Sequence, residues 1–276
     1  MTQPDEALPV EPTAPTLGQR LRSPAGRLAT RIAGVFLVIT AALVVFSFWW
    51  PDATLPRMAS TTEAAVRNTV LIFSLAAAPV MGLVWGIAYF SLRHWRFGGD
   101  LPPEDGPPIR TNNKVVISWL LVSSGLTAFL LIWGLAELTA TTAAASTQTP
   151  LVVNVTGQQW LWSFSYPQDG GVSSHQLILP LGRPVLFEVT STDVIHSFWL
   201  PEMGIKIDAN PAVTTEVGTT PTLLGTFNVR CAELCGLNHA YMATTATVMT
   251  SSRFDSWIQS HGGVVGQNAT SGGSNG

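Results

Sequence analysis

Charged residues are scarce in this sequence of 276 residues. Asp, Glu, Lys and Arg make up 11% of the chain, which is about half of their share in an average soluble domain. Hydrophobic residues make up 46%, and this balance excludes a disordered chain and a coiled coil and indicates a protein that lies partly in lipid. The net charge of −3 offers no positive field for phosphate, which also excludes a nucleic-acid-binding protein.

Cysteine is rarer still, because the whole chain has two. A disulfide scaffold needs several pairs, so this class is excluded as well. Tryptophan, in contrast, is frequent, with ten residues. Membrane interfaces use tryptophan in this way.

Long uncharged runs occur three times. They comprise residues 32–50, 69–92 and 115–138, and the last of them is uncharged up to Glu137. Each run reaches the ~20 apolar residues that a helix needs to cross a bilayer. Buried helices of a soluble core are the alternative, and three such runs in one chain make it the weaker one. The sequence therefore predicts an extra transmembrane helix over 32–50 and a transmembrane helical hairpin over 69–138.

Positive charge predicts the orientation of these helices. Four arginines precede the first run, and three arginines and a lysine lie in the 93–114 loop, whereas the loop between the first two runs has only Arg57 and Arg67. Positive residues favour the cytoplasmic side, so we expect the N-terminus and the 93–114 loop inside and everything after residue 139 outside. A cleaved signal peptide is the alternative for the first run. The bulky end of this run, Phe48-Trp49-Trp50, favours a retained helix without deciding between the two.

Short apolar runs dominate residues 150–260. They are rich in Val, Thr, Ile and aromatic residues, and Gly, Pro, Asp or Asn separate them, which predicts short strands and an all-β sandwich. Four basic and eight acidic residues give this domain a charge of about −4 (4 − 8), which would steer a basic partner or simply keep the domain soluble. The proline-rich residues 1–31 predict a flexible arm, and residues 261–276, rich in Gly, Ser and Asn, predict a disordered tail.

Both cysteines lie in one segment with the pattern C-x3-C-x3-H-x2-M. It comprises Cys231, Cys235, His239 and Met242. Two thiolates, an imidazole and a thioether form a soft ligand set, which selects copper over magnesium, calcium or manganese. His196 follows a strand-like run upstream, and a neighbouring strand could bring it to the same loop.

Three other interpretations of these residues stay open. Two cysteines outside the membrane often form a disulfide, although such a bond needs neither His239 nor Met242. A zinc site uses a similar cysteine pair but would not need Met242. A lone histidine such as His196 is more often a hydrogen-bonded polar residue than a metal ligand. Only its pairing with the loop makes His196 a ligand candidate.

Three segments together resemble subunit II of the haem–copper cytochrome c oxidases. They are 157–167 (GQQWLWSFSYP), 194–201 (VIHSFWLP) and 231–242 (CAELCGLNHAYM). The resemblance runs from about residue 69 to about residue 260. It implies a membrane-anchored all-β protein, with N-terminal transmembrane helices followed by an extracytoplasmic, cupredoxin-like Greek-key β-sandwich over 150–260.

The resemblance also implies a dinuclear copper (CuA) centre. The thiolates of Cys231 and Cys235 would bridge two copper ions. His196 and His239 would each bind one copper ion, and Met242 would be a weak ligand of one of them.

Two further residues receive roles from the resemblance. The backbone carbonyl of Glu233 would be a ligand of the other copper ion, and its side chain would reach a magnesium ion at the interface with subunit I. Electrons from cytochrome c would enter at Trp160. The chain would lie in the plasma membrane with the other oxidase subunits and pass electrons to a haem in subunit I. Oxygen would be reduced to water there, coupled to proton pumping, so the chain would not be catalytic alone.

Some features depart from the family pattern. Leu161 stands where the family often has a tyrosine, and residues 112–116 have no acid where many members have a Glu of a proton-uptake path, so we assign no proton-uptake residue. A C-x2-C-H motif is absent from the sequence, which excludes a fused c-type haem. The open alternatives are a CuA-bearing subunit of a nitric oxide reductase and a membrane-anchored copper chaperone. The intact donor set argues against a quinol oxidase subunit, which lacks the copper ligands.

Overall fold

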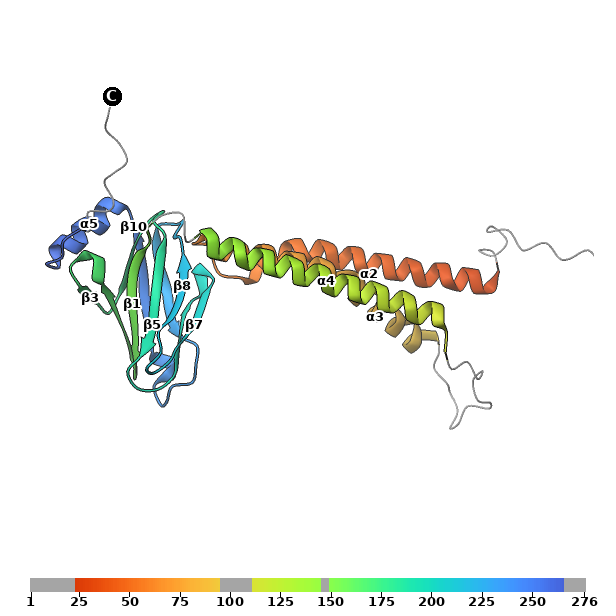
Figure 1. Ribbon diagram of the computed structural model, residues 1–276. Coiled ribbons are helices and arrows are strands. Elements are labelled where there is room, and N and C mark those ends of the chain that lie inside the picture. The colour runs from red at the N-terminus through yellow and green to blue at the C-terminus, as the bar shows by residue number, and fades with distance from the viewer. Residues whose placement is uncertain (1–22, 95–110, 145–148, 266–276) are drawn as a thin grey trace, which may run out of the picture. The chain divides into compact units, whose positions relative to one another are not determined.

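A computed structural model describes residues 23–94, 111–144 and 149–265 (Figure 1). Within these ranges the chain forms two compact units, one of residues 23–48 and 74–94 and the other of residues 49–73, 111–144 and 149–265. Most of the expected arm (1–31), loop (93–114) and tail (261–276) lies outside the described residues.

Three long helices precede the sandwich in the chain: α2 (Pro24–Thr54), α3 (Thr61–His94) and α4 (Asn113–Ala144). Each contains an apolar stretch long enough to cross a membrane, and at most 17% of the residues in each stretch are buried. An apolar helix with outward-facing side chains is stable in lipid, because its backbone groups bond to one another. The prediction of apolar N-terminal helices is confirmed.

Helices α2 and α3 pack closely within the first unit. Gly82 and Gly86 lie four residues apart on α3, and Ala78 one turn earlier is buried. A Cβ atom at Gly82 would overlap Oγ1 of Thr40 on α2, and one at Gly86 would lie 3.8 Å from the Cα of Phe36. Small residues at this spacing allow two membrane helices to approach each other's backbone, so the extra helix has a fitted partner in its own chain.

Apart from residues 49–73 and 111–144, the second unit is a sandwich of two five-stranded sheets (Figure 1). The first sheet has the order β3 (Val172–Ser174), β2 (Leu161–Tyr166), β1 (Leu151–Gln158), β5 (Val185–Ser191), β8 (Thr215–Thr219). The second has the order β4 (Leu177–Pro180), β10 (Ala243–Met249), β9 (Gly225–Cys231), β6 (His196–Leu200), β7 (Ile205–Ala209). The pairs β1–β5 and β4–β10 are parallel, and the other pairs are antiparallel. The predicted β-sandwich is confirmed.

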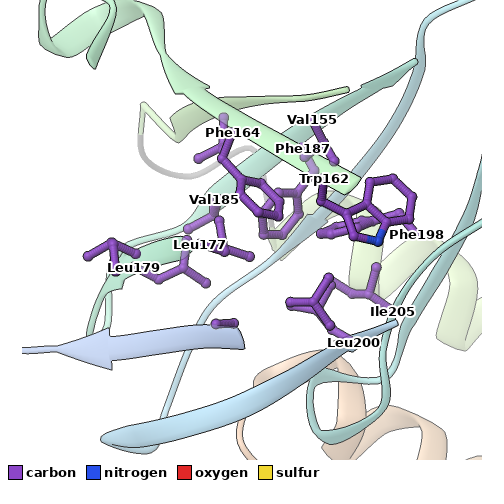
Figure 2. Packing of buried hydrophobic residues seen from close by; sticks show 14 of the residues in the cluster. Val155, Trp162, Phe164, Leu177, Leu179, Val185, Phe187, Phe198, Leu200 and Ile205 are labelled. Carbon is purple, nitrogen blue, oxygen red and sulfur yellow. The ribbon is translucent and has the colours of Figure 1, made fainter. Parts of the chain in front are cut away.

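Alternation along the strands builds the core between the sheets. Every second residue of β1 and β5 is buried, because successive side chains of a strand point to opposite faces. Phe198 of β6 lies at the centre, with its ring centroid 5.4 Å from that of Phe187 and 5.5 Å from that of Trp162 (Figure 2). The Trp162 ring is also 6.0 Å from the His196 ring, so the aromatic core extends to the end of the sandwich that carries the metal-site candidates.

Short elements close the sandwich. They are η1 (Pro167–Asp169), η2 (Pro201–Met203), η3 (His239–Tyr241) and helix α5 (Ser251–Ser260). Helix α5 buries Phe254 and Ile258, and the Phe254 ring lies 5.9 Å from that of Tyr166. The Tyr166 hydroxyl donates to the carbonyl of Ile178 and accepts from its N–H, both at 2.8 Å, which satisfies this buried polar group on both sides.

Residues 59–63, which include the first turn of α3, lie against the sandwich, and we name them the docking segment. Ala59 donates its N–H to the carbonyl of Glu202 at 2.9 Å, and its own carbonyl accepts the N–H of Thr222 at 2.8 Å. Ala59 is fully buried and belongs to the core cluster. The N-terminal start of α3 is thereby part of the folded β-domain, which the sequence did not predict.

Two side chains complete the docking segment. Ser60 donates its hydroxyl to the carbonyl of Met203 at 2.7 Å and accepts the N–H of Glu63 at 3.1 Å, so it caps α3. Gly204 faces this turn, and a Cβ there would lie 2.9 Å from both Cα and N of Glu63. Since Gly204 also has φ +63°, glycine is required at this position for two separate reasons.

Candidate metal centre

Two paired strands and one loop bring the sulfur and nitrogen donors together. His196 is the first residue of β6, and Cys231 is the last residue of β9. These strands pair with Phe198 opposite Cys231. The loop that follows Cys231 returns to β10, because the N–H of Cys231 bonds to the carbonyl of Met242 at 3.0 Å. Residues far apart in the sequence therefore meet at one end of the second sheet.

The two sulfur atoms of Cys231 and Cys235 lie 3.8 Å apart. A disulfide bond is about 2.05 Å long, so both cysteines are free thiols in this structure. The disulfide interpretation of the motif therefore finds no support in this geometry. Two free sulfurs at this distance are instead available as a pair of ligands.

The remaining donors surround this sulfur pair. Nδ1 of His196 lies 3.8 Å from Sγ of Cys231, and Nδ1 of His239 lies 3.6 Å from Sγ of Cys235. The thioether of Met242 is 3.7 Å from the Cys235 sulfur. The structure thus gathers one imidazole beside each thiol and a thioether beside one of them.

Glu233 contributes its backbone and not its carboxylate. Its carbonyl oxygen lies 3.2 Å from Sγ of Cys231, whereas its side chain is exposed. The two cysteines and His196 are buried, with donor atoms within 4.8 Å of one another. This donor set of two thiols, two imidazoles, one thioether and one carbonyl fits a soft transition metal such as copper. It does not fit a hard cation, which takes oxygen ligands.

Burial sets the protonation of the Cys235 thiol. Burial, the hydrogen bond with the Cys231 sulfur and the charge of that group together raise its pKa to about 11. Without metal, the thiol therefore holds its proton at neutral pH. A metal ion binds the thiolate, so metal binding at this site releases a proton.

Asp193 is a site residue that the sequence reasoning missed. Its Oδ1 lies 2.9 Å from Nε2 of the buried His196. Desolvation raises the Asp193 pKa, but hydrogen bonds from the Gln159 N–H, from His196 and from the Val194 N–H outweigh it and lower the pKa to about 2. An ionised carboxylate only accepts hydrogen bonds, so His196 donates from Nε2 to Asp193, and its Nδ1 faces the Cys231 sulfur. The sequence signal that could have identified Asp193 is an acid three residues before a candidate histidine ligand.

Trp160, where the resemblance has electrons enter, is half-buried beside the metal-site loop. A Cβ atom at Gly236 would lie 3.5 Å from Cζ2 and Nε1 of Trp160. The indole therefore contacts the residue that follows Cys235. Gly236 has φ +120°, a backbone conformation that residues other than glycine rarely adopt.

Comparison with known proteins gives consistent relatives. The family described as "Cytochrome C oxidase subunit II, periplasmic domain" matches residues 172–249. Cytochrome c oxidase subunit 2 of Thermostichus vulcanus is 30% identical over 275 residues, which cover 79% of this chain and 83% of that protein. The corresponding protein of Alkalihalophilus pseudofirmus is 28% identical over 203 residues, which cover 70% of this chain but only 58% of the relative's length.

One solved structure is similar to part of the chain. It is the crystal structure of the periplasmic domain of subunit II of cytochrome oxidase of Bradyrhizobium japonicum. It is 32% identical, covers 41% of this chain and 93% of that chain, and has a TM-score of 0.40.

Proposed function

The chain belongs to the cytochrome c oxidase subunit II family, and we propose that it is the electron-accepting subunit of a membrane-bound terminal oxidase. The observation that carries this proposal is the convergence of Cys231, Cys235, His196, His239 and Met242 at one end of the β-sandwich. A subunit without copper would have no use for this soft donor set. When bound, copper supplies one-electron redox chemistry at this site.

We propose that the donors hold two copper ions as a CuA centre. Cys231 and Cys235 bridge the two ions, and His196 and His239 bind one ion each. Met242 and the carbonyl of Glu233 are the weaker ligands. The ligands come from a sandwich whose sheets fix β6 and β9, so they keep their positions when the charge of the site changes. A rigid ligand set of this kind favours fast electron transfer.

Trp160 is the proposed site at which electrons arrive from cytochrome c. Its indole contacts Gly236, the neighbour of the bridging Cys235. Electrons then pass to a haem in subunit I, where oxygen is reduced to water and protons are pumped. The exposed side chain of Glu233 is free to reach a magnesium ion at the interface with subunit I.

The proposed membrane topology follows from the charge distribution in the sequence. The N-terminus lies in the cytoplasm, and the three helices α2, α3 and α4 cross the plasma membrane. The copper domain then lies on the outer face, in reach of a diffusing cytochrome c. Lipid and the other oxidase subunits cover the apolar faces of the helices.

Copper stoichiometry and electron paramagnetic resonance of the full chain in detergent test the centre. We expect two copper ions per chain and the hyperfine pattern of one electron shared equally by two copper nuclei. Cys235→Ser is expected to abolish this pattern while the helices still insert into the membrane. One copper ion with the pattern of a single nucleus would refute the dinuclear centre and favour a copper chaperone. Co-purification with a nitric oxide reductase catalytic subunit would move the same centre to that enzyme.

A further inference from the structure

A chain of hydrogen bonds connects the two halves of the metal site on the side away from the sulfur atoms. We propose that Gln159 and Asp193 are positioning residues that hold His196 and the 232–238 loop at the spacing required by the donors before metal binds. This inference rests on the proposed metal site, but it does not depend on the oxidase partner. We call the two residues the brace.

Three segments that are distant in the sequence meet in the brace. Gln159, directly after β1, donates its backbone N–H to Oδ2 of Asp193 at 2.8 Å. Its side-chain Nε2 donates to the carbonyl of Cys235 at 2.7 Å. Asp193 in turn accepts from Nε2 of His196 at 2.9 Å. The path from His196 to Cys235 therefore runs through two side chains outside the donor set.

Asp193 is itself held in a fixed orientation. Its Oδ1 also accepts the N–H of Val194 at 2.6 Å and the hydroxyl of Ser191 at 3.2 Å. With the Gln159 N–H on Oδ2, both oxygens are engaged. A carboxylate fixed in this way sets the rotation of the His196 ring, because the ring must donate to it along a defined direction.

Gln159 adds a hydrogen bond to a loop whose two leucine side chains are exposed. Leu234 is 78% exposed and Leu237 is 90% exposed, so apolar packing of these side chains does not hold the loop in place. The amide of Gln159 lies where a side chain at position 236 would be, since a Cβ there would be 2.9 Å from its Nε2. A side chain at position 236 would therefore displace the Gln159 amide from its present position.

The test compares Gln159→Ala, Gln159→Glu and Asp193→Asn with the matched control Gln158→Ala in the full chain in detergent. Gln158 is exposed and precedes the brace by one residue. Gln159→Glu keeps the side-chain length but places an acceptor against the Cys235 carbonyl, so it should be at least as damaging as Gln159→Ala. The backbone hydrogen bond from residue 159 to Asp193 remains in both.

Hydrogen exchange of the metal-free chain gives the first measurement. We expect the amides of residues 232–238 to exchange about 5- to 10-fold faster in Gln159→Ala than in Gln158→Ala, because one hydrogen bond is lost. Copper affinity gives the second, with an expected loss of about 10- to 100-fold for Gln159→Ala and for Asp193→Asn. In copper-loaded Asp193→Asn we also expect altered hyperfine coupling, because a neutral amide oxygen is a weaker acceptor for the His196 N–H and the new NH2 group would oppose the Gln159 N–H.

The outcomes separate the brace from the proposed function. Exchange, copper affinity and spectrum of Gln159→Ala that equal those of Gln158→Ala would overturn the brace. Failure of the unsubstituted chain to bind copper would instead overturn the proposed function. The exchange measurement still decides the brace in that case, because it uses the metal-free chain.

Discussion

Gly204→Ala is expected to release the docking segment from the β-sandwich. The substitution has two separate costs. Alanine at φ +63° costs about 1 kcal/mol relative to glycine, because its Cβ is unfavourable in the left-handed region. In addition, the new Cβ would lie 2.9 Å from two backbone atoms of Glu63, and no rotation of a side chain relieves a contact with backbone.

The second cost follows from the hydrogen bonds that the segment makes. Displacing Glu63 also displaces Ala59 and Ser60, whose bonds to the carbonyls of Glu202 and Met203 measure 2.9 and 2.7 Å. Losing these two bonds costs about 2 kcal/mol, at about 1 kcal/mol for each. We therefore expect Gly204→Ala to lower the free energy of unfolding of the β-domain by about 3 kcal/mol in total.

Gly171→Ala is the matched control. Gly171 has φ +73°, and a Cβ there would meet no atom within 4 Å, so only the backbone cost of about 1 kcal/mol applies. Denaturant unfolding of the full chain in detergent, followed by near-ultraviolet circular dichroism of the core aromatic rings, measures both variants. Hydrogen exchange at Ala59 and Thr61 reports the release of the segment directly. Equal destabilisation by the two variants, with unchanged exchange at residues 59–61, would refute the reasoning.

Three further predictions concern metal binding, electron entry at Trp160 and helix packing. Copper affinity, measured by chelator competition, should rise by about tenfold per pH unit for each displaced proton between about pH 6 and pH 8. Cys235→Ser should lower this slope by about one proton. An affinity that does not change with pH would contradict the raised pKa of Cys235. Trp160→Phe should slow stopped-flow electron transfer from reduced cytochrome c while the copper spectrum stays unchanged, and an unchanged rate would exclude Trp160 from the path. Gly82→Val should destabilise the packing of α2 on α3 by about 1–3 kcal/mol, as measured by unfolding in detergent. The control Gly125→Val on α4 has open space and should cost less. Equal losses of stability would argue against the close contact between Gly82 and α2.

Elements marked by the length of apolar runs were predictable from the sequence. The three long uncharged runs predicted the N-terminal helices, and the short runs after residue 150 predicted the sandwich, because a helix in lipid needs about 20 apolar residues whereas strands are short. The segment from Cys231 to Met242 contains most of the donors within twelve residues. A local pattern with so many donors is visible without any knowledge of the fold.

Features that depend on strand register were not predictable. Gln159 and Cys235 are 76 residues apart, and Ser60 and Met203 are 143 residues apart. Nothing local distinguishes Gln159 from its neighbour Gln158, which is exposed as well, or Ser60 from an ordinary helix cap. Their partners are defined only once the sheets pair and the segment before α3 reaches η2.

The sandwich fold places the donor atoms of this site. They lie within 3.2–3.8 Å of their neighbours among the two sulfurs, and His196 and Cys231 lie on strands that pair with each other. The sandwich core, through Trp162 and Phe198, stabilises the strands that carry His196 and Cys231. Core packing therefore orders the strands that carry these two ligands. Such a site has little freedom to rearrange when its charge changes, which is the property that an electron-transfer centre requires.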